Sequence, residues 1–83
     1  MITNYFTFGC GQTFAEHHVT ITARNTARCR EIMFDTFGEK WSMQYQDDPG
    51  TNDRYPTKEL MNITESETGA LFTTIHSAEI IVK

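Results

Sequence analysis

Three arginines gather around the start of a predicted helix. Arg24 precedes the helix, and Arg28 and Arg30 lie in its first part. The positive end of a helix dipole favours Asp or Glu, so each of these arginines is expected to cost about 0.3–1 kcal/mol in the free protein. An anionic partner would remove that cost. We therefore expect a phosphate to face the backbone N–H groups of Thr26, Ala27 and Arg28, with Arg24 and Arg28 supplying charge-assisted hydrogen bonds.

Histidine and cysteine supply the other side chains that could do chemistry. His17 and His18 precede the arginines and could assist in binding the anion. Together with Cys10 and Cys29 they include the ligand types of a tetrahedral zinc site, but the spacing matches no recognised zinc finger, so no metal is expected. Cys10 beside either histidine would resemble a nucleophile and its base, yet no third, orienting group is identifiable. The sequence therefore predicts no catalytic residue and a protein that is not an enzyme.

The arginines must be positioned by a helix whose ends are both marked. Asn25 is a good N-cap, and Gly38 stands where a glycine ends a helix. Between them an apolar stripe follows the helical period, and it predicts the face that packs on the core. Its members are Cys29, Ile32, Met33, Thr36 and Phe37.

Phe34 projects well off this stripe, on the same side of the helix as Arg30. An aromatic side chain on the outer face of a helix is either simply exposed or part of an interface. We expect Phe34 and Arg30 to contribute to contacts with another subunit or a partner protein.

Alternating polarity predicts the strands around the helix. Residues 2–8 and 19–23 alternate and are close enough to form a hairpin, and residues 41–45 place Trp41, Met43 and Tyr45 on one face that could cover the helix. The expected fold is α+β, a small antiparallel sheet with a β-β-α-β core, further C-terminal strands and one helix packed on a face. The chain is expected to be a single domain (1–83) with a core at 1–46, a loop at 47–59 and C-terminal strands within 60–83, at 60–64, 70–75 and 78–82.

Length and charge limit the possible classes of function. A chain of 83 residues has a small core, and oligomerisation would be a natural remedy. The net charge is −4, with four acids and four bases in residues 1–46 but seven acids and three bases in residues 47–83. This is too little positive charge for general nucleic-acid binding. No apolar run approaches the roughly 20 residues that span a bilayer, so we expect no membrane partner. The N-terminus lacks a signal-peptide pattern, and we therefore expect a cytoplasmic protein whose cysteines are reduced. No cofactor is expected.

Two segments resemble a group of small phage and prophage proteins. They are YFTFGCGQ at Tyr5–Gln12 and REIMFDTFGEKWSMQYQ at Arg30–Gln46. In length class and β-β-α-β order the chain is also similar to phage anti-Thoeris sponge proteins, which sequester cyclic ADP-ribose-type signals between subunits. In this resemblance Arg28 is the residue whose type and position suit phosphate binding. The resemblance implies a counter-defence role in the cytoplasm of the host cell.

These observations together predict a non-enzymatic phage accessory protein, a homo-oligomer of single-domain subunits, that binds an anionic small ligand such as a nucleotide-derived signal. The alternative is a protein-interaction module that inhibits a host factor through Phe34 and the acidic second half of the chain.

Overall fold

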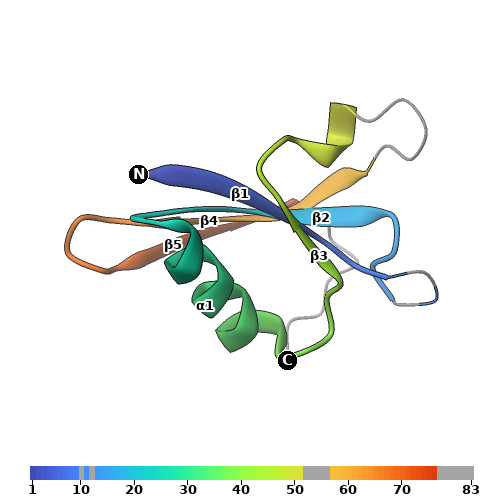
Figure 1. The fold of residues 1–83 in the computed structure, drawn as a ribbon, viewed down its shortest axis with the longest axis horizontal. Coiled ribbons are helices and arrows are strands. Elements are labelled where there is room, and N and C mark those ends of the chain that lie inside the picture. Colours follow the sequence, from blue (N-terminus) through green and yellow to red (C-terminus); the bar gives the residue numbers. More distant parts are fainter. Residues whose placement is uncertain (10, 12, 52–56, 77–83) are drawn as a thin grey trace.

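The protein forms one five-stranded sheet with a helix packed on one face, an α+β fold (Figure 1). The computed structural model describes residues 1–9, 11, 13–51 and 57–76. Along the chain the elements are β1 (Ile2–Thr7), β2 (His17–Ala23), α1 (Thr26–Phe37), β3 (Met43–Tyr45), the 3-10 helix η1 (Pro49–Thr51), β4 (Lys58–Glu65) and β5 (Leu71–Ile75). The predicted strand at 78–82 lies outside the described residues.

The sheet is mixed, which corrects the expectation of a wholly antiparallel sheet. The strand order is β3-β1-β2-β4-β5, and β2 pairs with β4 in parallel while the other three pairs are antiparallel. The predicted hairpin of β1 and β2 is present, with Phe6 opposite Val19. A parallel neighbour requires a long connection, and here the chain between β2 and β4 contains α1, β3 and η1.

The predicted ends of the helix are confirmed. The side chain of Asn25 accepts a hydrogen bond from the Arg28 backbone N–H at 2.8 Å, as an N-cap does. At the other end Gly38 has a φ of 62°, a conformation that L side chains rarely adopt, and its N–H donates to the carbonyl of Phe34.

The core lies between α1 and the central strands β1 and β2. Alternation puts Phe6 and Phe8 of the first strand on the helix side, and the stripe of α1 meets them through Cys29, Ile32 and Met33. The other buried apolar residues are Val19, Ile21, Ala23, Leu60, Met61 and Ile63, with Phe14, Phe37 and Trp41 packed partly against them.

The predicted aromatic face of residues 41–45 is only partly correct. Trp41 precedes β3 and packs edge-on against Phe6, with ring centroids 5.1 Å apart. Met43 and Tyr45 are exposed instead, because within β3 it is Gln44 that faces the helix. The chain therefore turns between Trp41 and the strand, and only the tryptophan of this group covers the helix.

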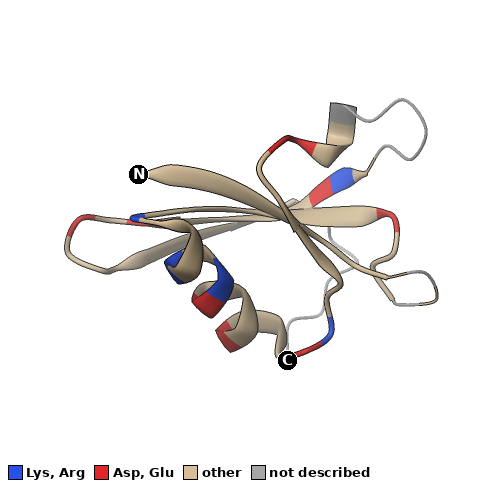
Figure 2. Ribbon diagram, viewed as in Figure 1, with Lys and Arg blue, Asp and Glu red and all other residues tan. Residues whose placement is uncertain are grey.

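In the part of the chain that the structure describes, no helix is both long and apolar enough to cross a bilayer. The longest helical segment, α1, has 12 residues, and charged residues are placed along it (Figure 2).

Candidate functional site

The arginines at the start of α1 bind a carboxylate within the protein. Arg24 donates from Nε and Nη2 to the two carboxylate oxygens of Glu65, at 3.1 and 3.2 Å, and Arg28 donates from Nε to Oε2 at 2.6 Å. Glu65 is the last residue of β4 and its side chain is 1% exposed. Arg28 also pairs with Glu31, one turn further along the helix.

These hydrogen bonds from Arg24 and Arg28 lower the pKa of Glu65 to about 2. The carboxylate is thus ionised and neutralised in place by two guanidinium groups. A hollow of about 360 Å³ lies outside this cluster, lined by Arg24, Asn25, Ala27, Arg28 and Glu31. The Arg28 N–H that we expected to face a phosphate is already bonded to Asn25.

The two histidines lie at the far end of β2 from Arg24. Five residues of β2 lie between His18 and Arg24, so the two are six steps of extended chain apart, about 20 Å. His18 is buried and shares a 2.8 Å hydrogen bond between Nδ1 and Thr57 Oγ1. His17 contacts the ring of Phe14, and its buried Nδ1 has no hydrogen-bond partner among the described residues. The structure therefore does not bring His17 or His18 together with Arg24, Thr26, Ala27 and Arg28.

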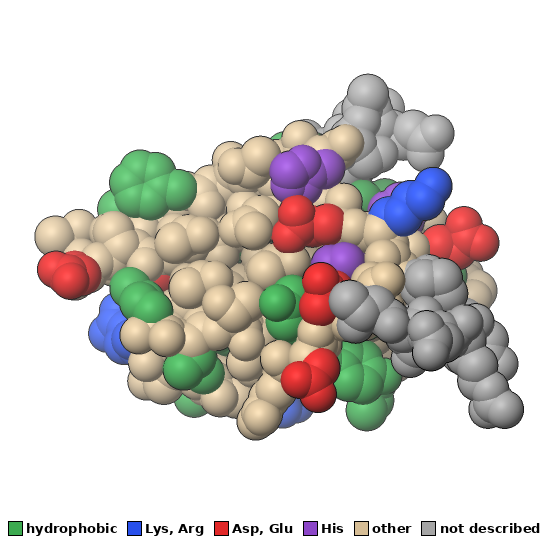
Figure 3. Space-filling model, turned by 90° about the horizontal axis from the view of Figure 1, so that it is seen from above, with side chains coloured by type: hydrophobic (Ala, Val, Ile, Leu, Met, Phe, Trp, Pro, Cys, Tyr) green, Lys and Arg blue, Asp and Glu red, His purple; other side chains and the backbone are tan. Residues whose placement is uncertain are grey.

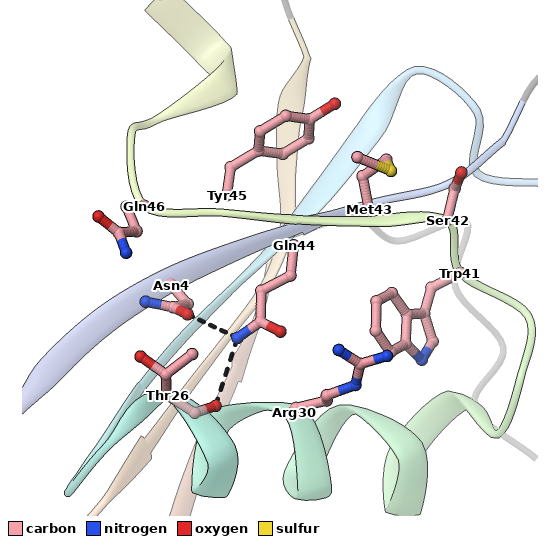
Figure 4. Close-up of a pocket in the computed structure, with 9 residues that line it drawn as sticks. All are labelled: Asn4, Thr26, Arg30, Trp41, Ser42, Met43, Gln44, Tyr45 and Gln46. Carbon is pink, nitrogen blue, oxygen red and sulfur yellow. Dashed lines mark hydrogen bonds between the residues drawn. The ribbon is translucent and has the colours of Figure 1, made fainter.

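Arg30 lies apart from the Glu65 cluster, in a groove between α1 and β3 (Figure 4). Its guanidinium carbon is 5.6 Å from the ring centre of Trp41 and 5.8 Å from that of Phe34. Among the described residues no carboxylate lies within salt-bridge distance of Arg30. The cation is held by aromatic rings and not by an acid.

Carboxamides form the other side of this groove. Gln44 Nε2 donates to Asn4 Oδ1 at 2.6 Å and to the Thr26 carbonyl at 3.3 Å. The amide of Asn4 in turn donates to the carbonyl of Thr3. Figure 4 shows the Gln44 oxygen on the side that faces Arg30. The groove has a volume of about 390 Å³ and is lined by Asn4, Thr26, Arg30, Trp41, Ser42, Met43, Gln44, Tyr45 and Gln46.

The chemistry of the groove suits a planar anion. Its described lining residues offer a guanidinium, aromatic surface and neutral amides, and none of them is a carboxylate. Its volume is in the range of small-molecule sites. Among the described residues that line it there is neither a nucleophile paired with a base nor a pair of carboxylic acids.

The cysteine that the structure describes is a packing residue. Cys29 is free and buried, and its Sγ lies 3.5 Å from the carbonyl oxygen of Ile21. Burial raises the pKa of the thiol, which favours its protonated form. Cys10 lies outside the described residues. Within the described ranges, no three His, Cys, Asp or Glu side chains are arranged to hold a metal ion.

Sequence patterns did not point to Asn4 or Gln44 as groove residues. Asn4 is a polar residue on the apolar face of β1, and this feature of the sequence could have indicated that its side chain has a polar partner. It is explained by the hydrogen bond from Gln44, which comes 40 residues later.

Comparisons of the chain with protein-family models, with characterised proteins and with solved structures found no match. Its function is therefore argued from the geometry of its own residues.

Proposed function

We propose that this protein binds a small, planar, anionic ligand, such as a nucleotide-derived signal, in the groove between α1 and β3. The observation that supports this most strongly is the placement of Arg30, which lies against Trp41 and Phe34 and has no salt bridge to a carboxylate of the described residues. Arg24 and Arg28, in contrast, are both bonded to Glu65. We expected the anionic ligand to bind at the start of the helix, and we propose instead that it binds to Arg30.

The aromatic and amide groups supply the rest of the recognition. A flat ring could stack against the exposed part of Trp41 or Tyr45, since stacking of a base on an aromatic side chain contributes about 1–3 kcal/mol. The amide of Gln44 is held in place by its bonds to Asn4 and Thr26, so its oxygen is available for a ring N–H.

The biological setting of this proposal comes from the resemblance to phage and prophage proteins. Residues 30–46, which include one of the resembling segments, contain Arg30, Trp41, Gln44 and Tyr45 of the groove. A counter-defence protein in the host cytoplasm would act by removing a signal from solution. Binding without turnover fits that role.

Isothermal titration calorimetry with AMP, ADP, ADP-ribose and cyclic ADP-ribose tests the proposal, with adenosine as the uncharged comparison. We expect at least one phosphate-bearing compound to bind, and Arg30→Gln to weaken its binding by at least tenfold. Lys40→Gln is the matched control, because it removes the same charge from an exposed residue outside the groove. Failure of all four compounds to bind, or equal binding by Arg30→Gln and the wild type, would overturn the proposal.

A second candidate function is a protein interface at Phe34. This side chain is 40% exposed, lies next to Arg30 on the outer face of α1 and has an ordered ring contact with Trp41. A second copy of the chain or a host factor could cover it. Sedimentation equilibrium of the wild type and Phe34→Ser tests the first partner: a dimer that Phe34→Ser converts to a monomer would support it, whereas a monomeric wild type would exclude it.

A further inference from the structure

The two outer strands of the described sheet differ in how their edges are protected. The strand order places β3 at one end and β5 at the other, with β4 as the described neighbour of β5 (Figure 1). β3 has three residues, whereas β5 has five, and none of these five is charged or a proline. Edge strands are usually kept short or protected by charged residues, proline or a β-bulge, because their free N–H and C=O groups can pair with another strand. Within Leu71–Ile75, β5 has none of these protections.

Hydrogen bonds at the two ends of the β4–β5 pairing show which backbone groups of β5 point outward. The Ser66 N–H donates to the carbonyl of Ala70 at 2.8 Å, and the His76 N–H donates to the carbonyl of Leu60 at 3.0 Å. In antiparallel strands, opposite residues alternate between pairs that exchange hydrogen bonds and pairs that do not, and the register between these two bonds is unbroken. Every second residue of β5 therefore points its N–H and C=O groups away from β4. These residues are Leu71, Thr73 and Ile75.

The side chains of β5 are exposed on both faces of the sheet. Leu71 lies opposite Glu65, whose carboxylate binds Arg28 of α1, so Leu71 projects on the α1 side. Ile75 projects on the same side, and the two side chains are 47% and 46% exposed. Phe72 projects on the opposite face, which Figure 3 shows, and is 64% exposed. Exposed apolar side chains, outward backbone groups and the absence of charge are together typical of a strand that pairs with another strand.

A second copy of β5 matches this edge in antiparallel orientation. With a twofold axis at Thr73, this residue lies opposite its own counterpart, and Leu71 lies opposite Ile75 of the second copy. The outward-pointing residues of the two copies then face one another, so each of these pairs can exchange both of its N–H···O bonds. The net charge of the chain is −4, but β5 has no charged side chain, so this pairing places no like charges directly opposite each other.

We propose that the protein forms a twofold-symmetric dimer in which the β5 strands of two copies pair in antiparallel orientation and join the two sheets into one. Leu71 of each copy then packs beside Ile75 of the other on the α1 side. This surface is distinct from the one at Phe34, because Phe34 contacts Trp41 next to β3, at the other end of the sheet. The described lining of the groove at Arg30 includes no residue of β5, so the dimer does not depend on the proposed ligand.

Sedimentation equilibrium of the wild type, Thr73→Lys and Thr74→Lys tests the proposal. Thr73→Lys places two like charges directly opposite each other at the twofold axis, so it should raise the dissociation constant of the dimer by at least tenfold. Thr74→Lys is the matched control, because it adds the same charge to an exposed neighbour that does not lie opposite its own counterpart. This control and Phe34→Ser should both dimerise as the wild type does.

Hydrogen exchange of single backbone amides, followed by NMR, separates this dimer from other ways of covering β5. The outward N–H groups of Leu71, Thr73 and Ile75 should exchange slowly in the dimer and rapidly after dilution to the monomer. Those of Phe72 and Thr74 point toward β4 and should stay protected at both concentrations.

Three results would overturn the proposal. The first is a wild type that is monomeric at all concentrations, and the second is a dimer that Thr73→Lys weakens no more than Thr74→Lys does. The third is slow exchange of the outward amides in the monomer, because another segment of the same chain would then cover β5.

Discussion

Arg28 Nε lies 2.6 Å from Oε2 of Glu65, which joins the first part of α1 to the last residue of β4 across 37 positions of sequence. Arg24 binds the same carboxylate from the other side. Two guanidinium groups on one buried acid explain why α1 begins with cations where its dipole favours anions. The anion that the helix start requires is present within the fold.

Replacement of Glu65 by glutamine should destabilise the protein markedly. Glu65→Gln keeps the size of the side chain but leaves Arg24 and Arg28 next to each other and to the positive end of α1 without their shared counter-ion. We expect a clear fall in the thermal unfolding midpoint. Glu67→Gln, the same change two residues later on an exposed turn, should leave the midpoint within the error of the measurement. Equal midpoints for the two variants would show that the cluster contributes nothing to stability.

The same carboxylate predicts a loss of stability in acid. The pKa of Glu65 is lowered from its ordinary value of 4.5 to about 2 by its two arginine partners. Its stabilising contribution is therefore fully present above pH 4.5, where the unfolded chain is also ionised, and is lost as the pH falls toward about 2. Urea unfolding from pH 6 to pH 2 should show a steeper decline for the wild type than for Glu65→Gln. Parallel curves for the two proteins would contradict the low pKa.

Local sequence patterns were sufficient to predict most elements of the fold. Asn25 and Gly38 marked α1 because capping depends on residues within one turn of the helix. Alternation predicted the strands β1 and β2 and their pairing as a hairpin. The parallel pairing of β2 with β4 was not predictable in this way, because nothing in the periodicity of a strand says which distant strand it joins.

The candidate site was less predictable than the fold for the same reason. The arginine pattern predicted an anionic ligand at the start of α1, whereas the structure places the carboxylate of Glu65 there, which lies far along the chain and could not be assigned from spacing. The groove combines Asn4 of β1 with Arg30 of α1 and Gln44 of β3. Each site is assembled by tertiary structure from residues that have no signature of their own.

Phe6 should be among the most sensitive positions of the core. It is fully buried near the C-terminal end of β1, and its ring contacts Trp41 edge-on. Phe6→Ala removes that contact and leaves a cavity, which typically costs about 3–5 kcal/mol, enough to unfold a large fraction of a domain of this size. Phe72→Ala is the matched control, because Phe72 is 64% exposed and its truncation should change the free energy of unfolding by about 0.5 kcal/mol or less. Urea unfolding followed by circular dichroism measures both, and similar values would contradict the assigned core.

Charge reversal at Arg28 and Arg30 should separate the structural arginine from the proposed ligand-binding one. Arg28→Glu would place a second carboxylate beside Glu65 and beside Glu31, so we expect a lower unfolding midpoint even though the helix dipole by itself would favour an acid there. Arg30→Glu removes a cation whose described interactions are with the rings of Phe34 and Trp41. This variant should therefore have a thermal unfolding midpoint close to that of the wild type. Thermal unfolding at low and high salt measures the difference, and the loss in Arg28→Glu should diminish as salt screens the new repulsion. If Arg28→Glu were the more stable variant, the ion pairs with Glu65 would not be the reason for the arginines at the start of α1.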